Sequence, residues 1–154
     1  MMKEHPDHHD AELLLRLYEL RREEKLRLAR GWLIGEFHSD SMDDFQNRFP
    51  AGSKENEYFR MAVSYWDMAA SIVKHGLINE ELFFESNSEL WAAWSKVKHL
   101  ALEGRTTYKN PHLWSNLEAL AEKYEKWMEA RAPGAVAAMR ERLKTLTAKK
   151  KSDK

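Results

Sequence analysis

Residues 54–75 constrain the fold most, because they predict one helix that must be buried on nearly every side. From Tyr58 to Val73, every position is apolar except for a few polar residues spaced three or four positions apart. These polar positions are Arg60, Ser64, Asp67, Ser71 and Lys74. On a helix they form one narrow stripe. Ser53 is a suitable N-cap and Gly76 a suitable C′ residue, so the segment predicts a central helix that other helices cover.

Short helices are predicted on both sides of this central helix. Ser41 is a natural N-cap for residues 42–49, and Pro50 ends that segment. Asn79 is a natural N-cap for residues 80–85. The two acidic residues that follow Asn79 suit the positive end of a helix dipole.

Three longer helices are predicted in the second half of the chain. The first begins at Ser88 or the residue before it, and Gly104 is expected to close it. The second is expected to have Asn110 as its N-cap and Pro111 as its first residue. The last follows the break at Pro133 and ends in a lysine-rich tail.

The N-terminal part predicts a long helix over about residues 11–37, with Asp10 as its cap. Residues 21–25 are all charged, so no apolar stripe continues through that turn. Either this turn projects from the body of the domain, or the helix packs against a partner only at its ends. We expect self-association to bury the large apolar residues on either side of the turn. They are Leu13, Leu17, Leu20, Leu28 and Trp32.

No segment alternates with a period of two residues for long enough to predict a strand. The fold class is therefore all-α, a single-domain bundle of about six or seven helices. Residues 1–10 are expected to form a disordered polar N-terminus and residues 148–154 a basic disordered tail. The helical domain would then span residues 11–147, with the long helix followed by the bundle at about 41–147.

Composition excludes several classes of protein. The 25 basic and 25 acidic residues balance, so there is no strong nucleic-acid signal. The absence of Cys excludes disulfides and Cys-based metal or redox sites. No apolar run approaches the roughly 18 residues of a transmembrane segment. The N-terminal segment lacks the apolar core of a secretory signal, so a cytoplasmic location is expected. No cofactor is predicted.

Over about residues 63–127 the chain resembles a family of small all-helical bacterial proteins of unknown function. The resemblance rests on the run from Gly76 to Leu82 and on scattered later positions. These are Trp94, Val97, Arg105, Asn110, Pro111, Trp114, Asn116, Leu117, Glu118, Leu120 and Ala121. These motifs are largely of the kind that mark the beginnings and ends of helices. The resemblance implies an all-helical fold and no activity.

Asp67 is the candidate for any catalytic role. It lies in the polar stripe of the central helix, between Ser64 and Ser71. If other helices cover this stripe, Asp67 becomes a buried carboxylate that needs a cation or several donors. In a cleft it would then act as an acid or base. The alternative is a stripe that faces water or forms one structural ion pair.

A candidate ligand or anion site follows Gly104. Arg105, Thr106 and Tyr108 carry donors and precede the expected start of the next helix. Free N–H groups at a helix N-terminus bind anions. The alternative is that Arg105 binds carbonyl groups of its own helix or pairs with an acid such as Glu118.

His99 and Glu103 are the candidate metal ligands, because an i,i+4 pair on a helix can share a metal ion. A structural site needs about four ligands, and no further ligand pattern accompanies the pair. The alternative is an ordinary surface pair.

The lack of a catalytic constellation favours a non-enzymatic interaction or assembly module, expected to be a homo-oligomer or to bind another protein. The first alternative is a small-ligand binder or enzyme with a pocket around Asp67 and Arg105. The second is weak contact between the basic tail and nucleic acid or a membrane surface, which salt would weaken.

Overall fold

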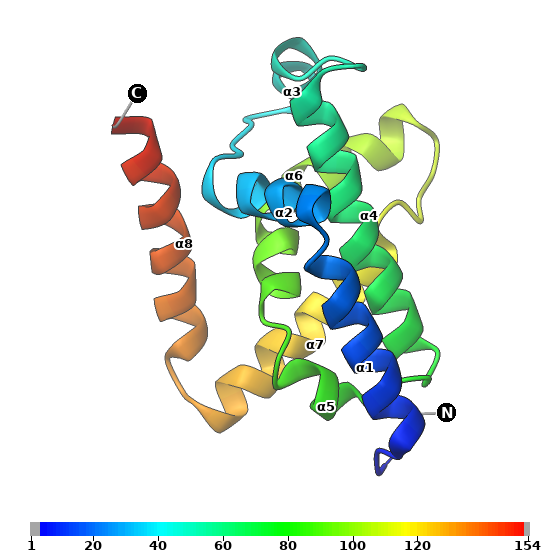
Figure 1. Ribbon diagram of the computed structural model, residues 1–154. Coiled ribbons are helices and arrows are strands. Elements are labelled where there is room, and N and C mark those ends of the chain that lie inside the picture. Colours follow the sequence, from blue (N-terminus) through cyan, green and yellow to red (C-terminus); the bar gives the residue numbers. More distant parts are fainter. Residues whose placement is uncertain (1–3, 153–154) are drawn as a thin grey trace.

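The computed structural model describes residues 4–152, with side chains up to residue 147, and this part of the chain forms eight helices without a strand (Figure 1). The helices are α1 (His8–Arg21), α2 (Glu24–Gly35), α3 (Met42–Arg48), α4 (Lys54–Lys74), α5 (Glu80–Phe84), α6 (Glu89–Thr107), α7 (Ser115–Arg131) and α8 (Ala135–Ser152). All but α5 have at least seven residues. The predicted all-α bundle is therefore confirmed.

Helix α4 is the central helix that the sequence predicts. It packs against α2, α5, α6 and α7. The Ser53 hydroxyl accepts a hydrogen bond from the Asn56 N–H, which caps the first turn. At the other end, Gly76 has a positive φ of 77°. The Leu77 N–H reaches back to the Ile72 carbonyl across this turn, as in a Schellman motif.

The core is built around α4 from large aromatic residues. Trp66 on α4 and Trp91 on α6 are almost completely buried. At one end of α4, the Phe45 and Phe59 rings lie 4.6 Å apart, and Phe59 also contacts Trp114 at 5.6 Å. These aromatic pairs fix how α3, α4 and the segment before α7 pack together.

The predicted long N-terminal helix over residues 11–37 is wrong, because two helices occupy this region. Arg22 ends α1, and Glu23 becomes the N-cap of α2 by accepting hydrogen bonds from Lys25 and Leu26. These backbone hydrogen bonds hold the pKa of Glu23 below its usual value. Because residues 22–25 of the charged turn are exposed, the chain can bend there, and the apolar faces of both helices then reach the core.

The beginning of α1 also differs from the prediction. Asp7 is the N-cap rather than Asp10, and helix α1 starts at His8, inside the segment expected to be disordered. Asp10 instead completes a capping box by accepting a hydrogen bond from the Asp7 N–H. Its carboxylate is fully buried and also accepts a hydrogen bond from the Asn79 N–H at the start of α5.

Two predicted boundaries in the second half are wrong. Gly104 does not close α6, which continues to Thr107. It is a buried position where a Cβ atom would lie 2.8 Å from a Leu113 methyl group, so the glycine permits close packing. Asn110 does not cap α7 either. Its side chain accepts from the His112 N–H in an Asx turn, and α7 begins only at Ser115.

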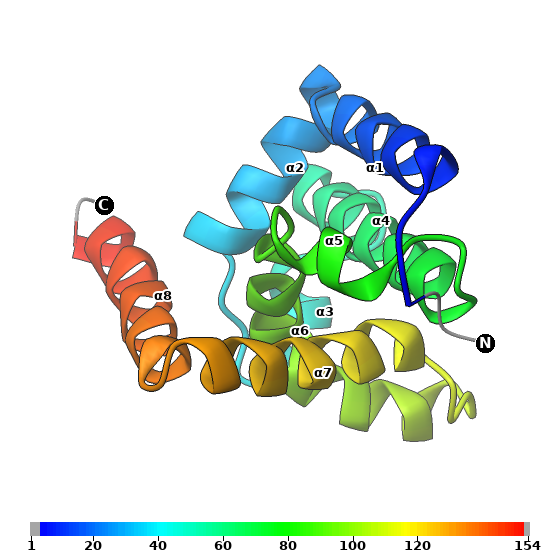
Figure 2. The same cartoon turned by 90° about the horizontal axis from the view of Figure 1, so that it is seen from below.

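Helices α1 and α8 lie at opposite edges of the molecule (Figure 2). Helix α8 contacts only α2 and α7 extensively, and Val136 is its only buried residue up to residue 147. The backbone of α8 continues to Ser152, past the predicted end of the domain at 147. The side chains of the predicted basic tail, residues 148–154, lie outside the described part.

Candidate functional site

Asp67 serves as the cap of another helix. Its carboxylate lies on α4 and accepts a 3.0 Å hydrogen bond from the Leu117 N–H in the first turn of α7. Helix α7 lacks a side-chain cap of its own, because Trp114 stands at its N-cap position. Asp67 is partly buried and lines an open cavity beside Trp114 and Asn116. These contacts assign Asp67 a structural role, and its suggested acid–base role stays a hypothesis.

Arg105 joins the end of α6 to the start of α7. Its Nε donates to the Leu113 carbonyl at 3.0 Å, and a terminal nitrogen lies 3.2 Å from the Glu118 carboxylate. The pairing with Glu118 is the alternative that the sequence analysis left open. Arg105 and Thr106 belong to the last turn of α6 rather than to a loop, and only Tyr108 follows the helix.

Asp67 and Arg105 therefore bind the same segment, residues 113–118, from different helices. Arg105 does not line the cavity that Asp67 lines. The structure thus brings the two candidate residues to one helix start without placing them in one shared cavity.

His99 and Glu103 are directed to different partners. A Glu103 carboxylate oxygen accepts a hydrogen bond from the Met42 N–H, in the first turn of α3. His99 Nε2 is buried and has no hydrogen-bond partner. Within the described residues, no group of three or more His, Asp or Glu side chains could hold a metal ion. Nothing in this geometry supports the predicted metal pair.

A cavity of about 720 Å³ lies between α8 and the body of the protein, and His99 lines it. One wall is the connection from α2 to α3, and the opposite wall includes Leu143 on α8. Between them, Trp94 on α6 lines the cavity, and Arg140 on α8 binds the Glu125 carboxylate of α7 at 2.6 Å. Arg140 thus ties α8 to α7, and Lys96 on α6 donates to the Thr147 hydroxyl of α8 at 2.9 Å on the same cavity wall.

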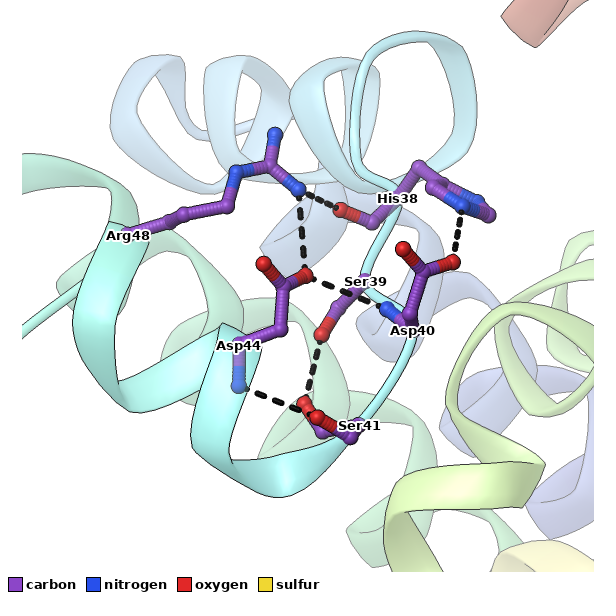
Figure 3. A network of polar contacts seen from close by, with 6 residues as sticks. All are labelled: His38, Ser39, Asp40, Ser41, Asp44 and Arg48. Atoms are coloured by element: carbon purple, nitrogen blue, oxygen red, sulfur yellow. Dashed lines mark hydrogen bonds and ion pairs between the residues drawn. The ribbon is translucent and has the colours of Figure 1, made fainter.

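Asp44 organises the α2–α3 connection, as Figure 3 shows. Its carboxylate accepts hydrogen bonds from the Asp40 N–H and from the Arg48 guanidinium. The first of these contacts, aided by Arg48, holds the pKa of Asp44 below its usual value. Arg48 also donates to the His38 carbonyl at 2.7 Å, so the loop is held at both His38 and Asp40. No sequence pattern predicts this network, because its contacts form only once the connection folds back on α3.

A second cavity, of about 440 Å³, lies at the aromatic end of α4. Its walls come from α3, α4, α6 and the segment before α7. The lining residues are Met42, Phe45, Ala51, Asn56, Phe59, Arg60, Leu100, Tyr108 and Trp114. Tyr108 is thus the one member of the predicted anion site that lines this cavity.

A partly buried polar network joins α1, α2, α4 and α6. Arg30 on α2 forms a two-pronged contact with Glu89 on α6, at 2.6 and 3.1 Å. The indole N–H of Trp66 donates to the same carboxylate, and Arg30 also donates to the Arg21 carbonyl at the end of α1. This network fixes the angle between α1 and α2, and its residues were missed because they lie far apart in sequence.

The predicted interface residues separate into two groups. Leu17 is buried, and Trp32 packs against Phe37 and Phe49 within the chain. The other three, Leu13, Leu20 and Leu28, are exposed on α1 and α2.

The described residues form an all-α bundle in which carboxylates on three helices accept hydrogen bonds from the backbone at the start of another helix. The chain belongs to the family described as domain of unknown function DUF4760, whose model matches residues 6–127. The match extends the predicted resemblance to include α1, α2 and α3, and it ends within α7, before α8. Comparison with curated proteins and with solved structures gave no match. No helix in residues 4–152 has both the length and the apolarity needed to cross a membrane.

Proposed function

We propose that the protein is a non-enzymatic assembly module whose α1–α2 face binds a second copy of the same chain. The face consists of Leu13, Leu20 and Leu28. The observation that carries the proposal is the concentration of exposed apolar side chains on α1 and α2. Of the ten large hydrophobic residues exposed in the described part of the chain, five lie between positions 13 and 28. These five are the three leucines of the face together with Leu15 and Tyr18.

The geometry of α1 supports this face. Leu13 and Leu20 are 36% and 42% exposed and lie seven residues apart, on one flank of the helix. Tyr18, on the other flank, is already covered in part by the guanidinium groups of Arg21 and Arg22, at 5.0 and 5.4 Å. Leu13 and Leu20 therefore form the flank of α1 that a second helix can cover.

The charge on this face favours a second copy over a strongly charged partner. Between positions 12 and 27, four acidic and four basic residues are exposed: Glu12, Glu19, Glu23 and Glu24, and Arg16, Arg22, Lys25 and Arg27. The two signs are interspersed along this segment and sum to zero. A two-fold interface, in which the same patch occurs on both copies, can pair these charges without net repulsion.

The test is the molar mass of the intact chain measured by light scattering at micromolar concentrations. We expect an oligomer for the natural sequence and a monomer for the combined variant Leu13→Gln, Leu20→Gln and Leu28→Gln. The matched control is Leu77→Gln with Leu102→Gln, because these leucines are 54% and 58% exposed but lie elsewhere. A natural chain that is monomeric throughout would refute the proposal.

Substitution is preferable to deleting the first helices. Leu17 on α1 and Leu33 on α2 are buried in the core of the same chain, and the Tyr65 hydroxyl donates to the Leu17 carbonyl at 2.6 Å. A chain that starts at Ser39 would lose these contacts and expose core residues of α4. Its change in mass would then reflect misfolding rather than loss of an interface.

A further inference from the structure

The cavity at the aromatic end of α4 has a base made of apolar side chains. Phe45 and Phe59 pack against one another, and Leu100 lines the same cavity and is fully buried. Its volume of about 440 Å³ falls within the range of small-molecule sites. An aromatic ring or a short aliphatic chain would gain burial there without displacing a helix.

Trp114 forms another wall in an unusual backbone conformation. Its φ is 54°, in the left-handed region that a bulky residue rarely adopts. Its ring lies 5.6 Å from Phe59 at an interplanar angle of 61°. Backbone strain of this kind tends to occur at functional sites. Here the left-handed turn places the indole ring against α4 and beside the cavity.

The polar groups of the cavity are few, and only one of them is charged. Among the lining residues, Arg60 is a cation and no residue is acidic. The Arg60 Nε donates to the Asn56 side-chain oxygen at 3.1 Å. Among the residues that the structure describes, no carboxylate lies within ion-pair distance of Arg60. Its two terminal nitrogens are thus free to bind an anion with two parallel hydrogen bonds.

Tyr108 adds a second polar group to the same cavity. Its hydroxyl oxygen accepts a 3.3 Å hydrogen bond from the Gln46 side-chain amide, which leaves the hydroxyl proton available for a ligand. Asn56 is already committed, because its amide donates to the Phe49 carbonyl at 2.9 Å. Arg60 and Tyr108 are therefore the two groups that can orient a bound molecule.

We propose that this cavity binds a small amphipathic organic anion. The apolar body of the ligand occupies the base formed by Phe45, Phe59 and Leu100, and its carboxylate or sulfonate group binds Arg60. This site is independent of the α1–α2 face, because neither of those helices contributes a lining residue. Failure of self-association would leave the binding site unaffected.

The experiment compares two fluorescent probes on the intact chain. The first probe is 8-anilinonaphthalene-1-sulfonate, and the second is N-phenyl-1-naphthylamine, which has the same aromatic body without the charge. We expect saturable binding of both probes to the natural sequence. Arg60→Gln should weaken binding of the sulfonate about tenfold and leave binding of the neutral probe unchanged, because it removes only the charge-assisted contact.

Two further variants show where the probes bind. Ala51→Trp places a large ring on the cavity wall and should weaken binding of both probes. Arg142→Gln removes an exposed cation on α8, a helix that contributes no lining residue to the cavity, and should change neither affinity. The proposal would be overturned if Arg60→Gln bound the sulfonate as tightly as the natural chain does. It would equally be overturned if Arg142→Gln weakened sulfonate binding as much as Arg60→Gln.

Discussion

The Asp67 carboxylate on α4 accepts a hydrogen bond from the Leu117 N–H on α7 at 3.0 Å. The two residues are fifty positions apart in sequence. In most helices a residue just before the first turn supplies such a cap. Here the preceding residue is Trp114, whose side chain offers no acceptor, so the cap comes from the helix against which α7 packs.

Two different replacements of Asp67 should destabilise the fold to different extents. Asp67→Ala removes the acceptor, and we expect it to lower the free energy of unfolding by about 1 to 2 kcal/mol. Asp67→Asn keeps an oxygen acceptor and loses only the charge at the helix N-terminus, so the expected loss is about 0.5 kcal/mol. Urea denaturation followed by circular dichroism measures both values.

The control for this pair is Ser64→Ala, one turn away on the same polar stripe. The Ser64 hydroxyl only donates to the Met61 carbonyl of its own helix, so this change should alter stability by less than about 0.5 kcal/mol. An Asp67→Ala protein as stable as the Ser64→Ala protein would show that the hydrogen bond to Leu117 does not hold α7.

Two other helices also receive a carboxylate from another helix at their start, in addition to their own caps at Ser41 and Asn79. Asp10 on α1 accepts from the Asn79 N–H before α5, and Glu103 on α6 accepts from the Met42 N–H of α3. Each carboxylate lies near the positive end of a helix dipole, where a negative charge is stabilising. The acidic residues that looked like candidate catalytic or metal-binding groups in the sequence thus connect helices.

The Arg30–Glu89 pair should be the most sensitive polar contact in the core. Their side chains are 17% and 26% exposed, so water screens them only in part. Glu89→Ala would leave the Arg30 guanidinium without its carboxylate and the Trp66 indole N–H without its acceptor. We expect a loss of about 2 to 4 kcal/mol in the free energy of unfolding, measured by denaturant titration.

Glu122→Ala serves as the comparison for Glu89→Ala. Glu122 is exposed on α7 and forms no ion pair within the described residues, so its loss should be within about 0.5 kcal/mol of zero. The loss of unfolding free energy in Glu89→Gln should fall between the losses in the two alanine variants. An amide oxygen can still accept a hydrogen bond from Trp66, while the charge is lost. Equal stability of the two alanine variants would mean that the network contributes nothing.

Local signals in the sequence were enough to predict the fold class and the best-defined helix ends. Ser41, Ser53 and Asn79 each cap the helix that follows them, and Gly76 ends α4. These features depend on residues within one turn of each other. Apolar periodicity identified α4 as central for a similar reason, since nearly its whole circumference is apolar.

The candidate site could not be predicted in the same way, because its contacts join distant residues. Arg60 looked like one of five polar residues on a stripe, and only the fold shows that Trp114 and Tyr108 lie beside it. Gly104 and Asn110 fit a common boundary pattern, but packing against Leu113 and an Asx turn gave them other roles. Local propensity was overridden by tertiary contacts at these positions.

The Tyr65 hydroxyl makes stability depend on pH in the alkaline range. Burial raises the pKa of Tyr65 from 10.0 to about 12, and nearby Arg21 and Arg30 offset part of this effect. Burial also raises the pKa of Tyr124. A raised pKa means that the folded state keeps its proton after the unfolded chain has lost it. The contribution of Tyr65 is therefore complete below pH 10 and is lost as the pH rises toward 12.

Comparison with Tyr65→Phe separates the contribution of the Tyr65 hydroxyl to stability from that of the lysines, which titrate in the same pH range. At neutral pH the variant should be less stable by about 1 kcal/mol, because the hydrogen bond to the Leu17 carbonyl is lost. The free energy of unfolding of the natural chain, relative to that of the variant, should fall by about 1 to 1.5 kcal/mol between pH 9 and pH 11. Urea titrations of both proteins across this range measure the difference. A difference that stays constant would show that Tyr65 ionises with an ordinary pKa and that its hydroxyl is not held by α1.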